Sequence, residues 1–134
     1  MPVDTLGKRA SLHDSATGKA ILAALPTARV DAVVDRHGLP ATTEETITDR
    51  EALEAELAAI RERGVAFDRE ERLVGLHCVA AAIHQNGDDH PGDVYGAIGV
   101  LGPTSRFTGD YFETDLPQVV RDAANIVELE MQGY

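Results

Sequence analysis

The sequence predicts one α+β domain over residues 1–134, with a mostly antiparallel sheet flanked by helices. Apolar residues recur at helical spacing in the first half of the chain and again near its end. Between these regions, segments 76–84 and 93–101 alternate with the period of strands and are separated by turn residues, which favours antiparallel pairing. A length of 134 residues is sufficient for one sizeable core.

The first two helices have recognisable ends. We expect a helix over 15–24, because apolar residues recur there at helical spacing and Asp14 or Ser15 can act as the N-cap. After a proline, a second helix is expected to be capped by Thr27 and to end at Gly38, a residue type favoured just beyond a helix.

The third helix carries a capping signature. Thr48 and Glu51 match a capping box, in which the hydroxyl and the carboxylate each accept a hydrogen bond from an orphan backbone amide. Gly64 is expected to end this helix. Its apolar stripe consists of Leu53, Leu57 and Ile60.

Three strands are expected in the middle of the chain. A short strand over 65–68 precedes the pair 76–84 and 93–101, whose connection contains Asn-Gly and Pro-Gly turn pairs within 86–92. The sheet signal is expected to end at Gly102.

The two longer strands have one face of mostly small side chains. A helix could dock closely on this face, or it could line a concave site for a small ligand, and the pattern does not distinguish the two. The residues concerned are Cys78, Ala80, Ala82, Ala97, Gly99 and Leu101.

The chain is expected to return to helix from Gly109, with Pro117 dividing a short helix from a longer one. The longer helix has a broad apolar face: Leu116, Val119, Val120, Ala123, Ile126, Val127 and Leu129.

The charge balance is strongly acidic. Asp and Glu number 23 against 12 Lys and Arg, a formal charge of −11, which should repel a phosphate backbone and so disfavours DNA binding by this chain alone. Such a surface also suits a high-salt cytoplasm, so a halophilic source is expected. The sequence has no export signal, no membrane-spanning run and one cysteine, which together predict a cytoplasmic protein without disulfides.

Six motifs in order resemble the effector-binding domain of the IclR family of transcriptional regulators. The resemblance runs from about Leu6 to about Leu129 and implies a GAF-like (profilin/PAS-like) fold with a pocket on the concave side of the sheet, lacking the family's first strands. It also implies a small-molecule effector, a homodimer or homotetramer, and DNA binding through a separate winged helix-turn-helix. The motifs are His13–Ala23, Leu39–Pro40, Ile47–Asp49, Arg63–Asp68, Gly75–Ala81 and Gly102–Arg106.

The resemblance also implies effector contacts at seven positions. The backbone amides of the first helix would face an anionic effector, such as a small carboxylate or a sugar acid, and an acidic residue, a cysteine and a leucine would line the pocket. The last two positions stand where the family places serine hydroxyls, so the effector is expected to be larger, less polar or absent. The seven are Ala16, Thr17, Asp68, Leu76, Cys78, Gly99 and Leu101.

Other interpretations of these residues stay open. Asp68 could simply begin a solvated acidic turn, Cys78 could be a small core residue, and Thr17 could be an ordinary helix-start residue. The whole domain could be a dimerising interaction module with a non-functional pocket.

We expect no enzyme, cofactor or metal site. Cys78 could act as a nucleophile with His77 or His84, but alternation places His77 on the opposite face and His84 far along the strand. The histidines and the cysteine also lack the paired spacing of zinc sites.

Overall fold

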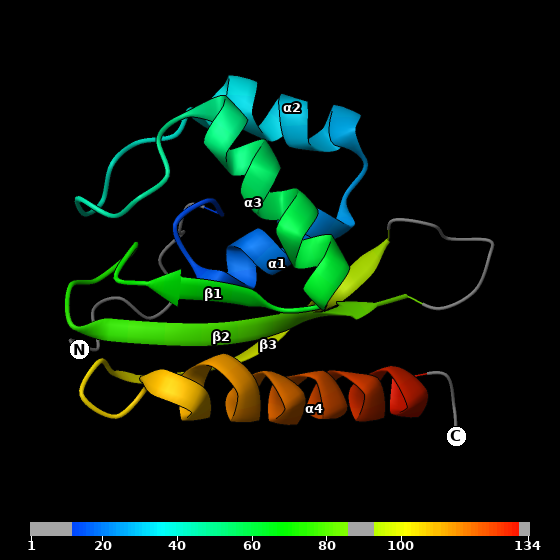
Figure 1. Cartoon of the computed structure of the whole chain (residues 1–134). Coiled ribbons are helices and arrows are strands. Elements are labelled where there is room, and N and C mark those ends of the chain that lie inside the picture. Colours follow the sequence, from blue (N-terminus) through cyan, green and yellow to red (C-terminus); the bar gives the residue numbers. More distant parts are fainter. Residues whose placement is uncertain (1–11, 86–92, 132–134) are drawn as a thin grey trace, which may run out of the picture.

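The computed structural model describes residues 12–85 and 93–131, which form a three-stranded antiparallel sheet between two layers of helices. Three helices cover one face of the sheet and a C-terminal helix covers the other (Figure 1). This confirms the predicted α+β class. The helices are α1 (Ala16–Ala24), α2 (Thr27–His37), α3 (Arg50–Arg63), the π-helical turn η2 (Tyr111–Asp115) and α4 (Leu116–Met131).

The strands lie in the order β1 (Ala66–Arg69), β2 (Leu76–His84) and β3 (Val94–Pro103). The predicted antiparallel pairing of β2 with β3 is confirmed. However, β3 continues two residues beyond the predicted end, because Gly102 and Pro103 still pair with β2, and an outer strand of the described sheet tolerates proline. The turn pairs predicted within 86–92 lie outside the described residues.

Close docking of α1 accounts for the small side chains on β2 and β3. Ala16 and Ala20 of α1 pack in one core cluster with Ala80 of β2, and all three are at most 2% exposed. Side chains this small let the helix backbone approach the sheet closely. Helix α3 adds Leu53, Leu57 and Ile60, the predicted stripe, to the same core.

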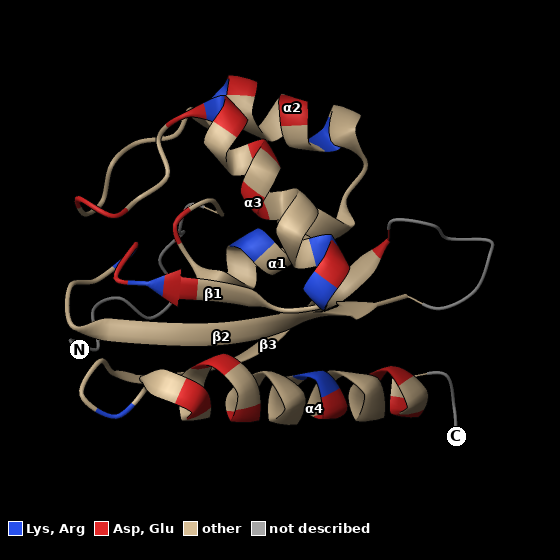
Figure 2. Cartoon of the chain, in the orientation of Figure 1, with Lys and Arg blue, Asp and Glu red and all other residues tan. Residues whose placement is uncertain are grey.

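The opposite face of the sheet packs against α4. Val79 of β2, Phe112 of η2 and Val120 of α4 are each at most 2% exposed and belong to a second core cluster. Pro117 does not divide two helices as predicted, because η2 runs directly into α4 at Leu116 and Pro117 is the second residue of α4. Acidic residues are spread over helices on both sides of the sheet (Figure 2). No helix in the described part of the chain is long and apolar enough to cross a membrane.

Helix ends follow the predictions at some positions and correct them at others. Ser15 caps α1 as expected, since its side chain accepts a hydrogen bond from Gly18 N. Thr27 does not cap α2; Pro26 occupies that position and Thr27 is the first helical residue. The predicted capping box is also wrong.

Helix α3 begins one residue later than the capping box requires. Asp49 is the N-cap, and its side chain accepts from Ala52 N at 3.0 Å. A carboxylate next to the threonine therefore takes the capping role. Gly38 and Gly64 end α2 and α3 at positive φ, as predicted.

Candidate functional site

Strand register brings three of the predicted effector contacts into one row. Asp68 of β1 pairs directly with Cys78 of β2, which pairs with Leu101 of β3. Directly opposed residues share a face of a sheet, and this face is the one covered by α1, since Cys78 packs against the α1 core cluster. The fold thus places Asp68 and Leu101, 33 positions apart in the chain, in one row with Cys78 between them.

The N-terminus of α1 lies beside this row. Ala16 is fully buried, whereas Thr17 is half-buried and its Cγ2 lies 3.3 Å from where a Cβ on Gly99 would be. Gly99 pairs with Ala80, the next position of β2 on the same face as Cys78. The structure therefore brings the predicted helix and strand contacts together at one end of α1.

Gly99 has a packing reason as well as a place in the site. A Cβ there would lie 2.9 Å from Ala80 Cβ and 3.0 Å from the carbonyl oxygen of Val79, in addition to the Thr17 contact. These distances are too short for an ordinary side chain. The paired strand β2 therefore leaves no room for a side chain at position 99, and Thr17 of α1 lies close by as well.

Two leucines provide apolar surface at this site: Leu101, which belongs to the row, and Leu76, which lies on the same face of β2 as Cys78. Leu76 is half-buried and pairs with Pro103, two positions along β2 from Cys78. Leu101 is 66% exposed on the outer strand of the described sheet. The row is therefore covered at its α1 end and open at Leu101.

Asp68 is a buried residue of β1 and does not begin the solvated turn that the sequence left open. The residue is 7% exposed, and its Oδ1 accepts a hydrogen bond from Glu71 N at 2.8 Å. Burial raises the pKa of Asp68 to about 6, although that backbone hydrogen bond opposes the rise, while the nearby Glu71 carboxylate adds to it. Asp68 is thus a mostly ionised acceptor at neutral pH that takes a proton readily.

Cys78 is placed as a neutral wall residue. Burial raises the pKa of its thiol to about 12, and the charge of Asp68 contributes in the same direction. A thiol with this pKa stays protonated and is a poor nucleophile. The histidines considered as partners lie elsewhere: His77 stacks on Phe112, on the α4 side, and His84 ends the strand.

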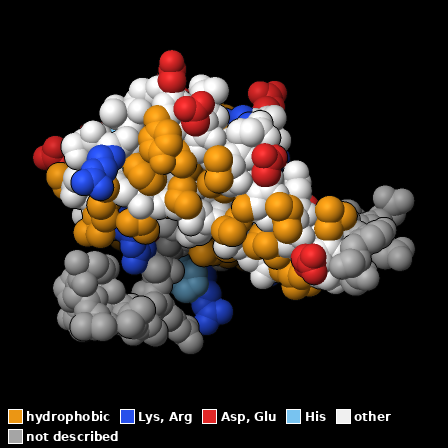
Figure 3. Space-filling model, turned by 90° about the horizontal axis from the view of Figure 1, so that it is seen from below, with side chains coloured by type: hydrophobic (Ala, Val, Ile, Leu, Met, Phe, Trp, Pro, Cys, Tyr) orange, Lys and Arg blue, Asp and Glu red, His pale blue; other side chains and the backbone are white. Residues whose placement is uncertain are grey.

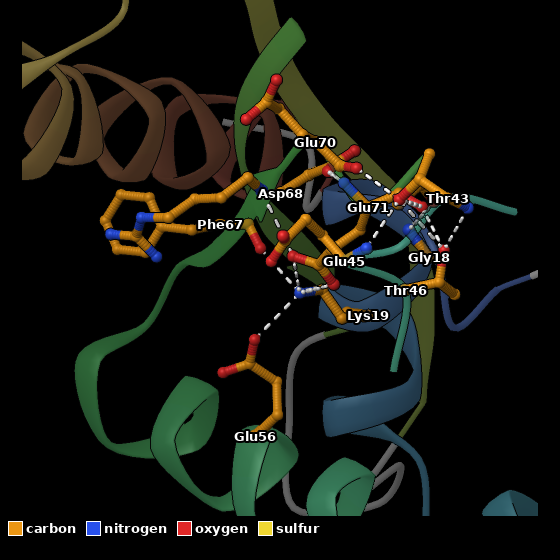
Figure 4. Close-up of polar contacts among 12 residues, drawn as sticks. Gly18, Lys19, Thr43, Glu45, Thr46, Glu56, Phe67, Asp68, Glu70 and Glu71 are labelled. Carbon is orange, nitrogen blue, oxygen red and sulfur yellow. Dashed lines mark hydrogen bonds and ion pairs between the residues drawn. The ribbon is translucent and has the colours of Figure 1, made fainter. Parts of the chain in front are cut away.

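A buried lysine next to the row was not predicted. Lys19 of α1 is completely buried, and its Nζ donates to Glu71 Oε1 at 2.7 Å, Glu56 Oε2 at 2.9 Å and the carbonyl oxygen of Phe67 at 2.6 Å (Figure 4). Helical spacing provides the signal that could have found it, because Lys19 lies three residues from Ala16 on the helix.

Glu71 links this lysine to the predicted site. Its amide donates to Asp68, its carboxylate accepts from Lys19, and its carbonyl accepts from Thr46 Oγ1 at 2.5 Å and Thr43 Oγ1 at 3.1 Å. The loop between α2 and α3 is thereby tied to the turn after β1. The sequence suggested only a charged surface turn here, because long-range partners cannot be read from local pattern.

Surface hollows occur elsewhere among the described residues. One of about 440 Å³ lies along α2, one of about 250 Å³ lies between α2 and α3, and one of about 160 Å³ lies near the far end of β2. None of the three is lined by a predicted effector contact. Within residues 12–85 and 93–131, no group of three or more His, Cys, Asp or Glu is placed to hold a metal ion.

Comparison with known proteins matches one family. Its description is bacterial transcriptional regulator IclR C-terminal, and the match covers residues 2–129. The HTH-type transcriptional repressor AllR of Escherichia coli K12 is 40% identical over 119 residues, which is 89% of this chain and 42% of the relative. AllR of Klebsiella pneumoniae is 39% identical over 121 residues. The chain thus spans less than half the length of these curated relatives. Both are transcriptional regulators and not enzymes.

Solved structures show the same fold. The Thermotoga maritima IclR superposes with a TM-score of 0.85 at 31% identity, over 96% of this chain and 50% of that one. The C-terminal domain of E. coli KdgR gives 0.82 at 30% identity, over 96% and 74%. The inducer-binding domain of an Acinetobacter PobR double mutant, in complex with 3-hydroxybenzoic acid, gives 0.80 at 25% identity, over 92% and 68%.

Proposed function

The chain belongs to the family of C-terminal effector-binding domains of IclR-type transcriptional regulators, and on that premise we propose that it senses a small carboxylate or sugar acid. In this proposal residues 1–134 form one effector-binding and oligomerisation domain. Binding of the effector controls the hold on DNA of a separate winged helix-turn-helix. The formal charge of −11 supports this division, because the domain itself repels DNA.

The observation that carries the proposal is the row of Asp68 and Cys78 beside the N-terminus of α1. The first amides of a helix favour a carboxylate, and a largely ionised aspartate favours a hydroxyl donor. A hydroxylated acid has both groups. Leu76 and Leu101 would contact the apolar part of such a molecule, and the aromatic hydroxy acid bound to the PobR domain has the same combination.

The test is a thermal-shift screen with lactate, D-gluconate and 3-hydroxybenzoate, repeated on Asp68→Asn. An effector that binds only the folded protein raises its melting temperature. Asparagine still provides an oxygen to accept the hydrogen bond from Glu71 N, so the turn is kept while the charge is lost. Asp68→Ala would remove that hydrogen bond too, and would therefore disturb the fold as well as the site.

We expect a shift in the wild-type protein that Asp68→Asn abolishes. Asp122→Asn is the matched control, since Asp122 lies exposed on α4, on the opposite side of the sheet. A shift that persists in Asp68→Asn would remove Asp68 from the site. No shift with any of the three acids would contradict a carboxylate sensor.

A second candidate function is that of an oligomerisation module, and the exposed apolar face of α4 favours it. Val119, Ile126 and Leu129 are 58%, 60% and 50% exposed. Figure 3 shows this side of the molecule, where apolar side chains gather. Contiguous exposed apolar surface is typical of protein contacts. We expect a dimer or tetramer by analytical ultracentrifugation, with Ile126→Glu shifting the protein toward monomer; an unchanged mass would exclude α4 as the contact.

A further inference from the structure

Glu71 uses every polar group it has to join three parts of the fold. Its amide holds the Asp68 carboxylate at 2.8 Å, and its carbonyl accepts from the Thr46 hydroxyl of the loop between α2 and α3. Its carboxylate receives Lys19 Nζ on both oxygens, at 2.7 and 2.9 Å, and Arg69 N at 3.2 Å. The Glu71 amide therefore orients Asp68, and the contacts of the Glu71 side chain fix the position of that amide (Figure 4).

Lys19 supplies the other half of this arrangement from inside the core. A buried ammonium is costly unless it is fully paired, and Lys19 is 0% exposed with two carboxylates and a carbonyl around it. Its position is therefore narrowly determined, and so is that of the Glu71 carboxylate. The carbonyl that Lys19 binds belongs to Phe67, the residue next to Asp68.

We propose that Lys19 and Glu71 are positioning residues of the effector site, which hold the turn after β1 so that the Asp68 carboxylate faces the effector. This inference rests on the proposed role of Asp68. Neither side chain offers the effector a free polar group, because Lys19 Nζ is completely buried among its acceptors and the Glu71 carboxylate is held by Lys19 and by Arg69 N. Their effect on affinity is transmitted only through Asp68 and the backbone of the turn.

The chain offers a matched pair of variants to test this. Glu71→Gln and Glu56→Gln each remove one carboxylate charge from a hydrogen bond to Lys19, at similar distances. Only Glu71 also contacts the Asp68 turn; Glu56 lies on α3. In each variant Lys19 keeps one carboxylate partner, and urea unfolding of both variants measures how much stability each substitution removes.

The first readout needs no effector. The Asp68 carboxyl is titrated by carbon-detected NMR in the wild-type protein and both variants. The Glu71 charge raises the pKa of Asp68, so Glu71→Gln should lower that pKa, while Glu56→Gln should leave it close to the wild-type value. Equal shifts in the two variants would overturn the inference.

The second readout is affinity, measured by calorimetry for lactate, D-gluconate and 3-hydroxybenzoate. Glu71→Gln should weaken binding about tenfold, the low end of what loss of a supporting residue costs in metal sites, and Glu56→Gln should change it less than about twofold. Equal losses in both variants, or none in Glu71→Gln, would overturn the positioning role. If no acid binds the wild-type protein, the proposed function fails, and the titration alone decides whether Glu71 controls Asp68.

Folding of Glu71→Gln is checked by circular dichroism and urea unfolding. If it does not fold, the double variant Lys19→Met/Glu71→Gln replaces it, because removing both charges leaves no unpaired ammonium in the core. The double variant should also bind the acids more weakly than the wild-type protein does. Wild-type affinity in the double variant would count against the proposal.

Discussion

At position 99, a single methyl group would collide with the sheet and with α1 together. The Cβ would lie 2.9 Å from Ala80 Cβ and 3.3 Å from Thr17 Cγ2. The same strand contains Gly96, where an added Cβ meets nothing within 4 Å. The two glycines therefore have different physical roles although they lie three residues apart in one strand.

We predict that Gly99→Ala lowers the free energy of unfolding by about 1–3 kcal/mol, the usual cost of overpacking a core. Gly96→Ala should be neutral or slightly stabilising, because it only restricts the unfolded chain. Urea unfolding of both variants provides the measurement. Equal effects would show that β2 and α1 adjust freely around position 99.

Asp68 makes stability depend on pH in a defined direction. Its pKa is about 6 in the folded protein, against an ordinary value of 3.8. As pH rises between these values, the unfolded chain releases the proton before the folded chain does, so the free energy of unfolding falls through this window and stays lower above it.

The prediction is best measured as a difference between wild type and Asp68→Asn. From about pH 4 to about pH 6.5, wild type should lose stability relative to the variant, by roughly 1.4 kcal/mol for each unit of pKa shift. Burial acts to raise the pKa of Glu56, but Lys19 holds that pKa below the usual range, so Glu56 adds stability as pH rises. Glu56 is present in both proteins, so its contribution cancels in the difference. A flat difference would contradict the raised pKa.

At the scale of elements, α3 shows how adjacent polar residues compete for a cap. Thr48 matched a capping box, yet Asp49 makes the hydrogen bond to Ala52 N. Asp49→Ala should therefore lower the free energy of unfolding by about 1 kcal/mol, while Thr48→Ala should change it by less than half of that. Thermal unfolding of the two variants distinguishes them, and a larger loss for Thr48→Ala would restore the capping box.

The apolar residues of α4 fall into a buried set and an exposed set, which the sequence pattern did not distinguish. Leu116, Val120 and Ala124 are buried against the sheet, whereas Val119 and Ile126 are exposed on another side. Apart from Ala124, the residues of both sets belong to the broad apolar face expected from the sequence. The helix packs only one of them, because a single sheet covers only part of a helix surface.

At the scale of the whole molecule, the excess of acidic residues is the dominant surface property. Asp and Glu residues are distributed over helices on both sides of the sheet, and the formal charge is −11. Repulsion among these charges destabilises the compact folded state. Salt screens this repulsion, and the screening length falls to about 3 Å at 1 M salt.

We predict that the melting temperature rises steadily from dilute buffer to molar potassium chloride. The same titration with sodium sulfate and with sucrose separates charge screening from general exclusion of solute, since sucrose does not screen charge. Equal stability in dilute and molar potassium chloride would contradict the halophilic interpretation of the composition.

Local pattern was sufficient for much of the fold. The period of apolar residues determined the three early helices, the strand pair and the terminal helix, and glycines at 38 and 64 determined where two helices end. These features depend on contacts between residues close in the chain, so local sequence is enough to predict them. The site residues came instead from motifs in order, and the structure adds that Asp68 and Cys78 are direct partners in the sheet.

Only the tertiary structure decided which polar groups are buried together. Lys19 and Glu71 are 52 positions apart, and each has an ordinary place in its local pattern, one in a helix and one in a charged turn. Docking of α1 on the sheet makes them partners and excludes water from both. At Gly99, likewise, the neighbouring strand and α1 leave no room for a side chain, because contacts between distant segments supply free energies that local sequence does not contain.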